Sequence, residues 1–143
     1  MMNILFLDND NDYRTLLMDF LGPVADDTRT ETEAGPQWTT GDYVLYQPST
    51  YQQAKTALQE VKDNPDDWVL LISDECQINI LFVIPEAEIS PTEVKIINIS
   101  PSEHKLLDGE IMMGKGATGR SMTDIIAEIE SRRLHAEEDH IVG

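Results

Sequence analysis

The segment Ile4–Leu21 constrains the fold more than any other part of the chain, because its pattern predicts a strand, an acidic loop and a helix in direct succession. Asn3–Leu7 is a short continuous apolar run, which is typical of a strand covered on both faces in a parallel sheet. The helix that follows has an apolar stripe at helical spacing: Tyr13, Leu16, Leu17, Phe20 and Leu21. Gly22-Pro23 is expected to end this helix.

The same alternation of apolar runs and amphipathic segments continues along the chain. Strands are predicted at four further places: Tyr43–Tyr46, Trp68–Ile72, Ile78–Ile84 and Val94–Ile99. Ser49 or Thr50 is expected to cap one further helix, and Ser121 to cap the last one. Strands that alternate with helices predict an α/β fold, here a three-layer sandwich with a mainly parallel central sheet.

The length of 143 residues suits one domain with a single core, predicted to span residues 1–134. Residues 26–42 are rich in Thr, Glu and Asp and are predicted to form a long exposed acidic loop. Trp38 within this loop is expected to pack back on the domain, although a partner-contact role stays open. Residues 135–143 are predicted to be a disordered acidic tail.

The formal net charge of -17 arises from 10 Lys and Arg residues against 27 Asp and Glu residues. Such a surface repels phosphate backbones and anionic membranes, so neither direct nucleic-acid binding nor membrane binding is expected. Three explanations of the charge remain open. They are solubility or life in a salty cytoplasm, an acidic face that docks a basic protein, and a surface that imitates nucleic acid.

No apolar run approaches the roughly 18–20 residues of a membrane helix. The chain passes from Met1 directly into a predicted strand, without the pattern of a secretion leader. Its one cysteine, Cys76, cannot form an internal disulfide and is interpreted as structural. These features predict a cytoplasmic protein, and they are compatible with a homodimer.

The opening Ile4–Leu21 resembles the start of response-regulator receiver domains, in which an apolar strand ends in acidic residues before an amphipathic helix. Tyr51–Leu58 is similar to the second helix of that family, and Pro65–Leu71 to the approach to its third strand. Val94–Ser100 resembles its fourth strand, which ends in Ser or Thr, and Lys115 matches the lysine that ends the fifth. The resemblance implies a receiver-like or flavodoxin-like fold.

The resemblance also implies a chemistry, the transfer of a phosphoryl group to an aspartate with the help of Mg²⁺. Asp8 and Asp10 would hold the Mg²⁺, and Asn9 stands where a second acid is usual in the family. Ser100 and Lys115 would hold the phosphate.

The phosphoacceptor position departs from the family. Alignment of the third strand places Ile72 there, and Asp74, the candidate acceptor, lies two residues further on. Ser73-Asp74-Glu75-Cys76 replaces the Met-Pro or similar ending common in the family. The favoured hypothesis is therefore a receiver-like regulatory domain that is not an enzyme, no longer takes phosphate and works through contact with a protein partner.

Two alternatives remain. The acidic composition is compatible with an inhibitor or decoy, for example from a virus or mobile element, that imitates nucleic acid and blocks a basic partner. Asp8-Asn9-Asp10 also resembles the DxD motif of haloacid-dehalogenase-type phosphohydrolases, which would make Asp8 a nucleophile and Asp10 a general acid near Mg²⁺. That family needs a later acidic pair, for which Asp74-Glu75 is the candidate.

Overall fold

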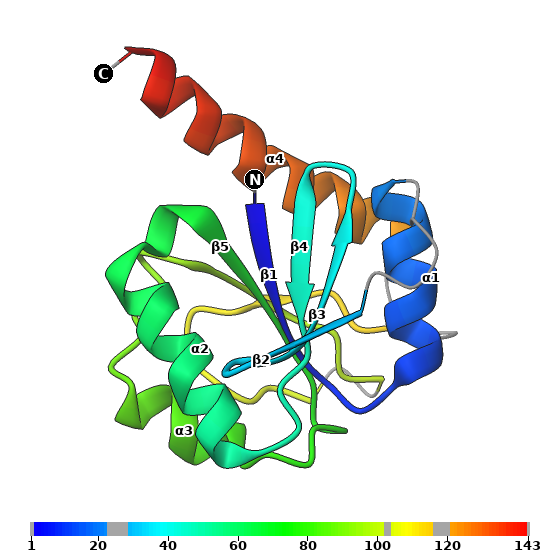
Figure 1. Ribbon diagram of the computed structural model, residues 1–143, viewed down its shortest axis with the longest axis vertical. Coiled ribbons are helices and arrows are strands. Elements are labelled where there is room, and N and C mark those ends of the chain that lie inside the picture. Colours follow the sequence, from blue (N-terminus) through cyan, green and yellow to red (C-terminus); the bar gives the residue numbers. More distant parts are fainter. Residues whose placement is uncertain (1, 23–28, 102–103, 116–120, 143) are drawn as a thin grey trace.

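The computed structural model describes residues 2–22, 29–101, 104–115 and 121–142, and within them one seven-stranded sheet. The strand order across the sheet is β2-β3-β4-β1-β5-β6-β7 (Figure 1). The strands are β1 (Met2–Leu7), β2 (Thr30–Thr32), β3 (Gly35–Thr40), β4 (Tyr43–Tyr46), β5 (Trp68–Ile72), β6 (Lys95–Asn98) and β7 (Ile111–Met112). Neighbouring strands from β4 to β7 are parallel, whereas β2, β3 and β4 pair antiparallel.

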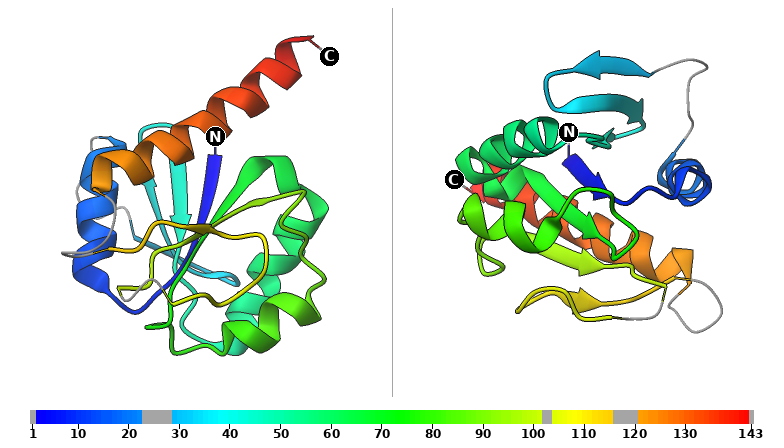
Figure 2. Two further views of the ribbon diagram at one scale, coloured as in Figure 1. Left: turned by 180° about the vertical axis from the view of Figure 1, so that it is seen from behind. Right: turned by 90° about the horizontal axis from the view of Figure 1, so that it is seen from below.

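Helices cover both faces of this sheet (Figure 2). α1 (Asn11–Leu21) and α4 (Met122–Val142) pack on one face, and α2 (Tyr51–Asp63) and α3 (Ile80–Glu86) on the other. A single turn of 3₁₀ helix, η1 (Pro65–Asp67), precedes β5. Side chains alternate along β1, so that Phe6 joins the core under α1 and α4 while Leu7 joins the core under α2 and α3. The predicted three-layer α/β sandwich with a mainly parallel sheet is confirmed.

The register of the parallel strands brings several chain segments to one edge of the sheet. Leu7 at the end of β1 lies opposite Ile72 at the end of β5. Ile72 in turn lies opposite Asn98 of β6, and Asn98 opposite Met112 of β7. The segments that follow these four residues therefore meet above the carboxyl ends of the strands, where open α/β sheets bind their ligands.

The predicted acidic loop over residues 26–42 is wrong for most of its length, because β2 and β3 form a hairpin there. Residues 26–28 lie outside the described part of the chain. β3 pairs with β4, with Trp38 opposite Leu45, and Trp38 packs into the core as expected. The hairpin was missed because it lies at the edge of the sheet and one face of it meets solvent, so its strands are polar.

The predicted strand at Ile78–Ile84 is also wrong, since this run contains most of α3. Ile80, Val83 and Ile84 are buried at helical spacing, while Leu81 and Phe82 point outward and are more than half exposed. A short apolar run has no period that separates a buried strand from a helix. The strands at Tyr43–Tyr46 and Trp68–Ile72 have the predicted bounds.

Two further predictions need correction at the helices. Leu16 and Phe20 belong to the predicted stripe of α1 but are exposed, and Leu17, Met18 and Leu21 are the residues it buries. The tail predicted to be disordered continues α4 as far as Val142, and the helix extends beyond the body of the domain (Figure 1). Among the described residues, no helix combines the length and the apolar character needed to cross a membrane.

Candidate functional site

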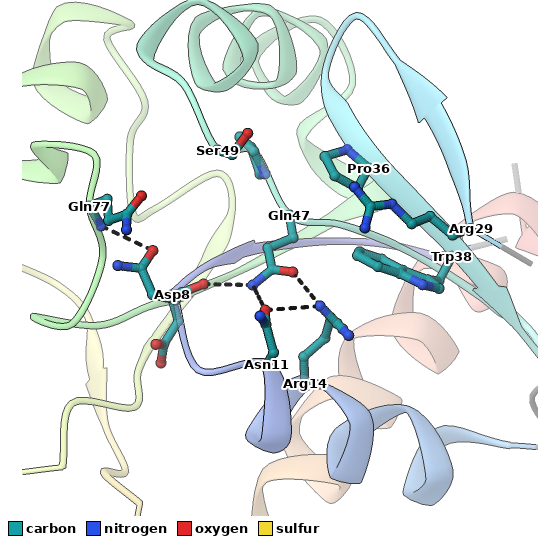
Figure 3. A pocket seen from close by; sticks show the side chains of 11 residues that line it. Asp8, Asn11, Arg14, Arg29, Pro36, Trp38, Gln47, Ser49 and Gln77 are labelled. Carbon is teal, nitrogen blue, oxygen red and sulfur yellow. Dashed lines mark hydrogen bonds between the residues drawn. The ribbon is translucent and has the colours of Figure 1, made fainter.

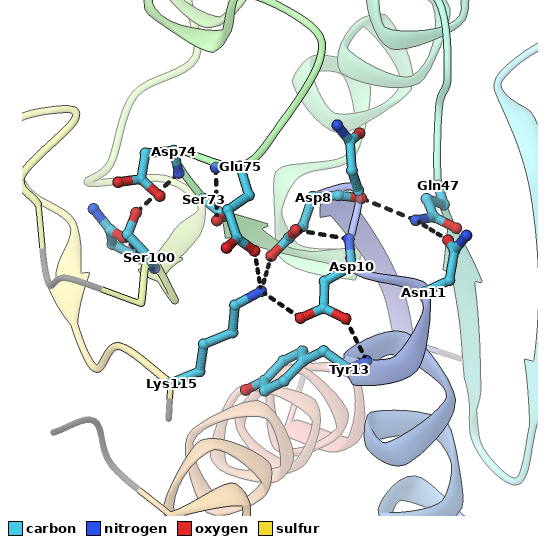
Figure 4. Close-up of polar contacts among 12 residues, drawn as sticks. Asp8, Asp10, Asn11, Tyr13, Gln47, Ser73, Asp74, Glu75, Ser100 and Lys115 are labelled. Atoms are coloured by element: carbon cyan, nitrogen blue, oxygen red, sulfur yellow. Dashed lines mark hydrogen bonds and ion pairs between the residues drawn. The ribbon is translucent and has the colours of Figure 1, made fainter. Parts of the chain in front are cut away.

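The residues predicted to form a site come together at the carboxyl ends of the central strands (Figure 4). Asp8 and Asp10 follow β1, Asp74 follows β5, Ser100 follows β6 and Lys115 follows β7. The parallel register described above is what brings them to one place. Within this group, however, the contacts divide into two parts.

The first part is centred on the ammonium group of Lys115, which three carboxylates surround. Its Nζ lies 2.5 Å from Asp8 Oδ2, 3.1 Å from Glu75 Oε2 and 3.3 Å from Asp10 Oδ2. The side chains of Lys115 and Asp8 are 6% and 0% exposed, so this ion pair is withdrawn from water. Asp8 Oδ1 also accepts a hydrogen bond from the backbone N–H of Asp10, at 2.9 Å.

The charge of this ammonium group is stabilised by its surroundings. Burial by itself would lower the pKa of Lys115, but the hydrogen bond and charge of Asp8, with hydrogen bonds to Glu75 and Asp10, raise it. The pKa of Asp10 is lowered, chiefly because its carboxylate accepts the backbone N–H of Tyr13. Lys115 and Asp10 are therefore both charged at neutral pH.

The ring of Tyr13 packs against the Lys115 ammonium group on the side of the cluster that faces the core. The ring lies 4.7 Å from the Nζ of Lys115, measured to the ring centroid, and stacks parallel to the ring of Phe6. Asp10 fixes the position of Tyr13, because its side chain caps the N-terminus of α1. The Tyr13 hydroxyl is buried and has no hydrogen-bond partner among the described residues. Burial, with the charges of Asp8 and Asp10, strongly raises the pKa of this hydroxyl.

The second part of the site contains Asp74 and Ser100. The backbone N–H of Asp74 donates to Ser100 Oγ at 3.0 Å, so the predicted hydroxyl lies next to the predicted acceptor. The Asp74 carboxylate lies on this side of the loop, with Oδ2 3.8 Å from His104 Nδ1. Glu75 is the residue of this turn that reaches Lys115, and its N–H donates to the hydroxyl of Ser73. Of the two adjacent acids in this turn, Glu75 therefore contacts Lys115, whereas Asp74 lies beside Ser100 and His104.

The arrangement does not fit the Mg²⁺ site that the receiver resemblance implies. The oxygens of Asp8, Asp10 and Glu75 that converge are those that contact the ammonium group, so a cation would have to displace Lys115. Asn9, at the second acid position, instead accepts the backbone N–H of Gln77. No group of three or more His, Cys, Asp or Glu side chains in the described ranges has the arrangement of a metal site.

Cys76 follows Glu75 and has no features of a reactive thiol. It is free and partly buried. Burial and the charge of Asp8 raise the pKa of its thiol to about 11. Because the thiolate is the nucleophile, very little of the reactive form exists at neutral pH.

Sequence reasoning missed two members of the cluster around Lys115. Glu75 was considered only as part of an acidic pair for a phosphohydrolase, and the turn that directs it to Lys115 leaves no mark in the sequence. Tyr13 was interpreted as part of the apolar stripe of α1, which is correct for its ring but not for its contact with the ammonium group. Its place three residues after Asp10, at the first turn of the helix, is the signal that could have found it.

Comparison of the chain with protein-family models, with curated proteins and with solved structures gave no match.

Proposed function

We propose that the chain is a receiver-like regulatory domain that acts through protein contact and does not take a phosphoryl group. The fold supports this proposal. With the hairpin β2–β3 set aside, the five parallel strands follow the order β4-β1-β5-β6-β7. If these five strands are renumbered 1 to 5 by their position along the chain, their order across the sheet is 2-1-3-4-5. This is the strand order of flavodoxin-like and receiver folds.

The observation that carries the proposal is the position of the Lys115 ammonium group between Asp8, Asp10 and Glu75. A receiver needs this place for a divalent cation and for the incoming phosphoryl group. Here an internal cation already forms ion pairs with the three carboxylates, and the Asp74 carboxylate lies beside His104. The arrangement is therefore better suited to hold the loops in one conformation than to accept a phosphoryl group.

The same geometry argues against a phosphohydrolase. A nucleophilic aspartate has to present a free oxygen to the phosphorus atom of its substrate. Both carboxylate oxygens of Asp8 are engaged, one by Lys115 and the other by the backbone of Asp10, and the side chain is fully buried.

Two surface features support a protein partner, and one of them indicates that this partner is basic. Leu81 and Phe82 of α3 are 56% and 58% exposed, and the Phe82 ring lies 6.2 Å from the ring of Tyr51, measured between centroids. Exposed apolar groups of this kind mark interaction surfaces when they cluster. Within the described ranges, seven Lys and Arg side chains already form ion pairs with acids of the same chain: Arg29, Lys62, Lys95, Lys105, Lys115, Arg132 and Arg133. The unmatched charge of the surface is therefore acidic, which would attract a basic partner.

Treatment with acetyl phosphate and Mg²⁺ tests the absence of phosphorylation. We expect intact-mass spectrometry to find no added phosphoryl group, because the lysine and not a metal ion fills the acidic cluster. A receiver domain with an intact acceptor, treated in parallel, shows that the reagents work. A stoichiometric adduct that disappears in Asp74→Ala and persists in Asp108→Ala, a fully exposed control, would overturn this part of the proposal.

Affinity capture from a lysate of the source cells tests the contact surface. The wild-type chain is compared with the double variant Leu81→Glu/Phe82→Glu and with a matched control, Leu16→Glu/Phe20→Glu on α1. The control replaces the same two residue types, Leu16 at 47% and Phe20 at 49% exposure, which are almost as exposed as Leu81 and Phe82. It also adds the same negative charge. We expect a captured polypeptide that is retained by the wild type and the α1 control and lost by the α3 variant. Equal capture by all three proteins would contradict a role for α3.

A further inference from the structure

A pocket of about 250 Å³ lies beside the Lys115 cluster but is separate from it (Figure 3). It is formed where the first turn of α1, the β2–β3 hairpin and the segment between β4 and α2 meet. Its polar and aromatic lining includes Asn11, Arg14, Arg29, Trp38, Gln47 and Ser49. Asp8 borders the pocket through its backbone, whereas its carboxylate points away toward Lys115.

Arg14 is held firmly in this pocket by groups that carry no charge. Its Nη1 donates to Gln47 Oε1 at 2.7 Å and to Asn11 Oδ1 at 3.0 Å. Its guanidinium carbon lies 4.2 Å from the centroid of the Trp38 ring. Gln47 is oriented in turn, because its Nε2 donates to the backbone oxygen of Asp8 at 2.9 Å. The guanidinium group is thus positioned before any ligand arrives.

The charge of Arg14 is not neutralised within the described part of the chain. Arg14 and Lys55 are the two described Lys or Arg residues that form no ion pair with a carboxylate there, and Lys55 is an exposed residue on α2. Arg14 is partly buried, its Nε is buried without an acceptor, and its Nη2 donates no hydrogen bond to a described residue.

A second guanidinium group faces the same pocket. Arg29 lies over the Trp38 ring at 5.7 Å, on the side opposite Arg14, and its Nε contacts Glu31 (Figure 3). Burial, and after it the charge of Arg29, lower the pKa of Arg14. An anion in the pocket, beside the edge of the Trp38 ring, would offset the charge of Arg14 and that of Arg29.

We propose that this pocket binds a compact phosphate group, either free inorganic phosphate or the terminal group of a small phosphate monoester. Arg14 offers Nη2, which donates to no described residue, and Arg29 adds a second guanidinium group that would exchange its contact with Glu31 for one with the anion. Since the Trp38 ring is covered on both sides by arginine, it supports the cations and does not stack on a ligand. The inference is independent of the proposed regulatory function, because no residue of the Lys115 cluster contributes its charge to the pocket.

Titration with sodium phosphate, followed by NMR of the tryptophan indole N–H groups at constant ionic strength, tests this inference. The chain has two tryptophans, and Trp68 is 2% exposed in the opposite core, where it serves as an internal reference. We expect a saturable shift of the Trp38 signal while the Trp68 signal stays in place. Arg14→Gln should weaken binding by about tenfold or more, because one charge-assisted contact is worth at least that factor.

The matched control is Lys62→Gln, which removes the same charge from an exposed pair with Glu88 on another part of the surface. Arg29→Gln serves as a second test should Arg14→Gln fail to fold, since Arg29 is exposed. In the wild type, phosphate should also raise the melting temperature by mass action, and this rise should be smaller in Arg29→Gln. Phosphoserine and inorganic phosphate, titrated separately, distinguish the two sources of the group. A linear shift without saturation, or equal weakening by Lys62→Gln, would overturn the proposal.

Discussion

Replacement of Lys115 by methionine should lower the free energy of unfolding by about 3–5 kcal/mol. Methionine fills a similar volume but leaves Asp8 as a buried carboxylate without its cation. The side chain of Asp8 is 0% exposed, so water cannot take over the role of the ammonium group. Glu75 and Asp10 would then face the same buried charge without a counter-ion. Urea denaturation at neutral pH measures the loss.

Two variants show whether the loss comes from the buried charge. Lys62→Met removes an exposed lysine from its pair with Glu88 and should cost no more than about 1 kcal/mol. Asp8→Asn added to Lys115→Met should restore roughly 1 kcal/mol or more, because it removes the unpaired charge. A double variant as unstable as the single one would show that the methionine disturbs packing and that the ion pairs contribute little.

The pH dependence of the Lys115→Met difference has a defined sign. The pKa of Lys115 is raised in the folded protein, so its ion pairs contribute in full below the ordinary lysine pKa of about 10.4. The contribution is lost as the pH rises through the still higher folded-state value. The stability gap between wild type and variant should accordingly be constant near neutral pH and narrow only at strongly alkaline pH.

Gly35→Ala should destabilise the chain by about 3–5 kcal/mol, because strain and steric overlap act together. Gly35 begins β3 with a φ of +99°, a conformation that alanine rarely adopts. A Cβ atom there would lie 2.8 Å from the Cα of Pro48, which is backbone and cannot turn aside. Relief of this contact would separate the hairpin from the segment that follows β4. Thermal and urea unfolding measure the effect.

Gly41→Ala is the matched control for the steric part of this prediction. Gly41 also has a positive φ, +56°, but its nearest neighbour would lie 3.5 Å from the new Cβ. Only the conformational cost applies there, about 1–2 kcal/mol. Equal losses of stability in the two variants would show that the contact between the new Cβ and Pro48 adds no steric cost.

The central part of the fold could be predicted from the sequence because buried parallel strands are continuous apolar runs. Asn3–Leu7 and Trp68–Ile72 are such runs, and both are strands in the interior of the sheet. The hairpin β2–β3 could not be found in this way, because an edge strand with one solvated face is rich in Thr, Glu and Gln. Ile78–Ile84 was misassigned for the opposite reason, since this short run is apolar except for Asn79 and shows no clear helical or strand period.

The sequence predicted which residues lie at the site where their position follows from the end of a strand. Asp8 and Ser100 follow strands that the apolar pattern predicts, whereas Lys115 follows β7, which was not predicted, and was selected only through the family resemblance. All three lie at one edge of the sheet. The contacts within the site depend on turn geometry, which places Glu75 and not Asp74 beside Lys115. The phosphate pocket could not be predicted at all, because Arg29 and Trp38 belong to the hairpin that the sequence did not indicate.

The added hairpin also changes what the sheet offers to other chains. Without it, β4 would be an outer strand with the apolar sequence Tyr-Val-Leu-Tyr and a free row of backbone donors and acceptors. Such a strand is a template for pairing with another molecule. The hairpin moves the outer edge to β2, which has three residues and carries Glu31, and the opposite edge is the two-residue β7. Among the described residues, β2 pairs with Gly35–Gln37 of β3 and leaves Trp38–Thr40 without an outer partner strand. The added strand β2 and the opposite strand β7 are themselves too short to pair at length with another chain, which disfavours fibril-like growth from them.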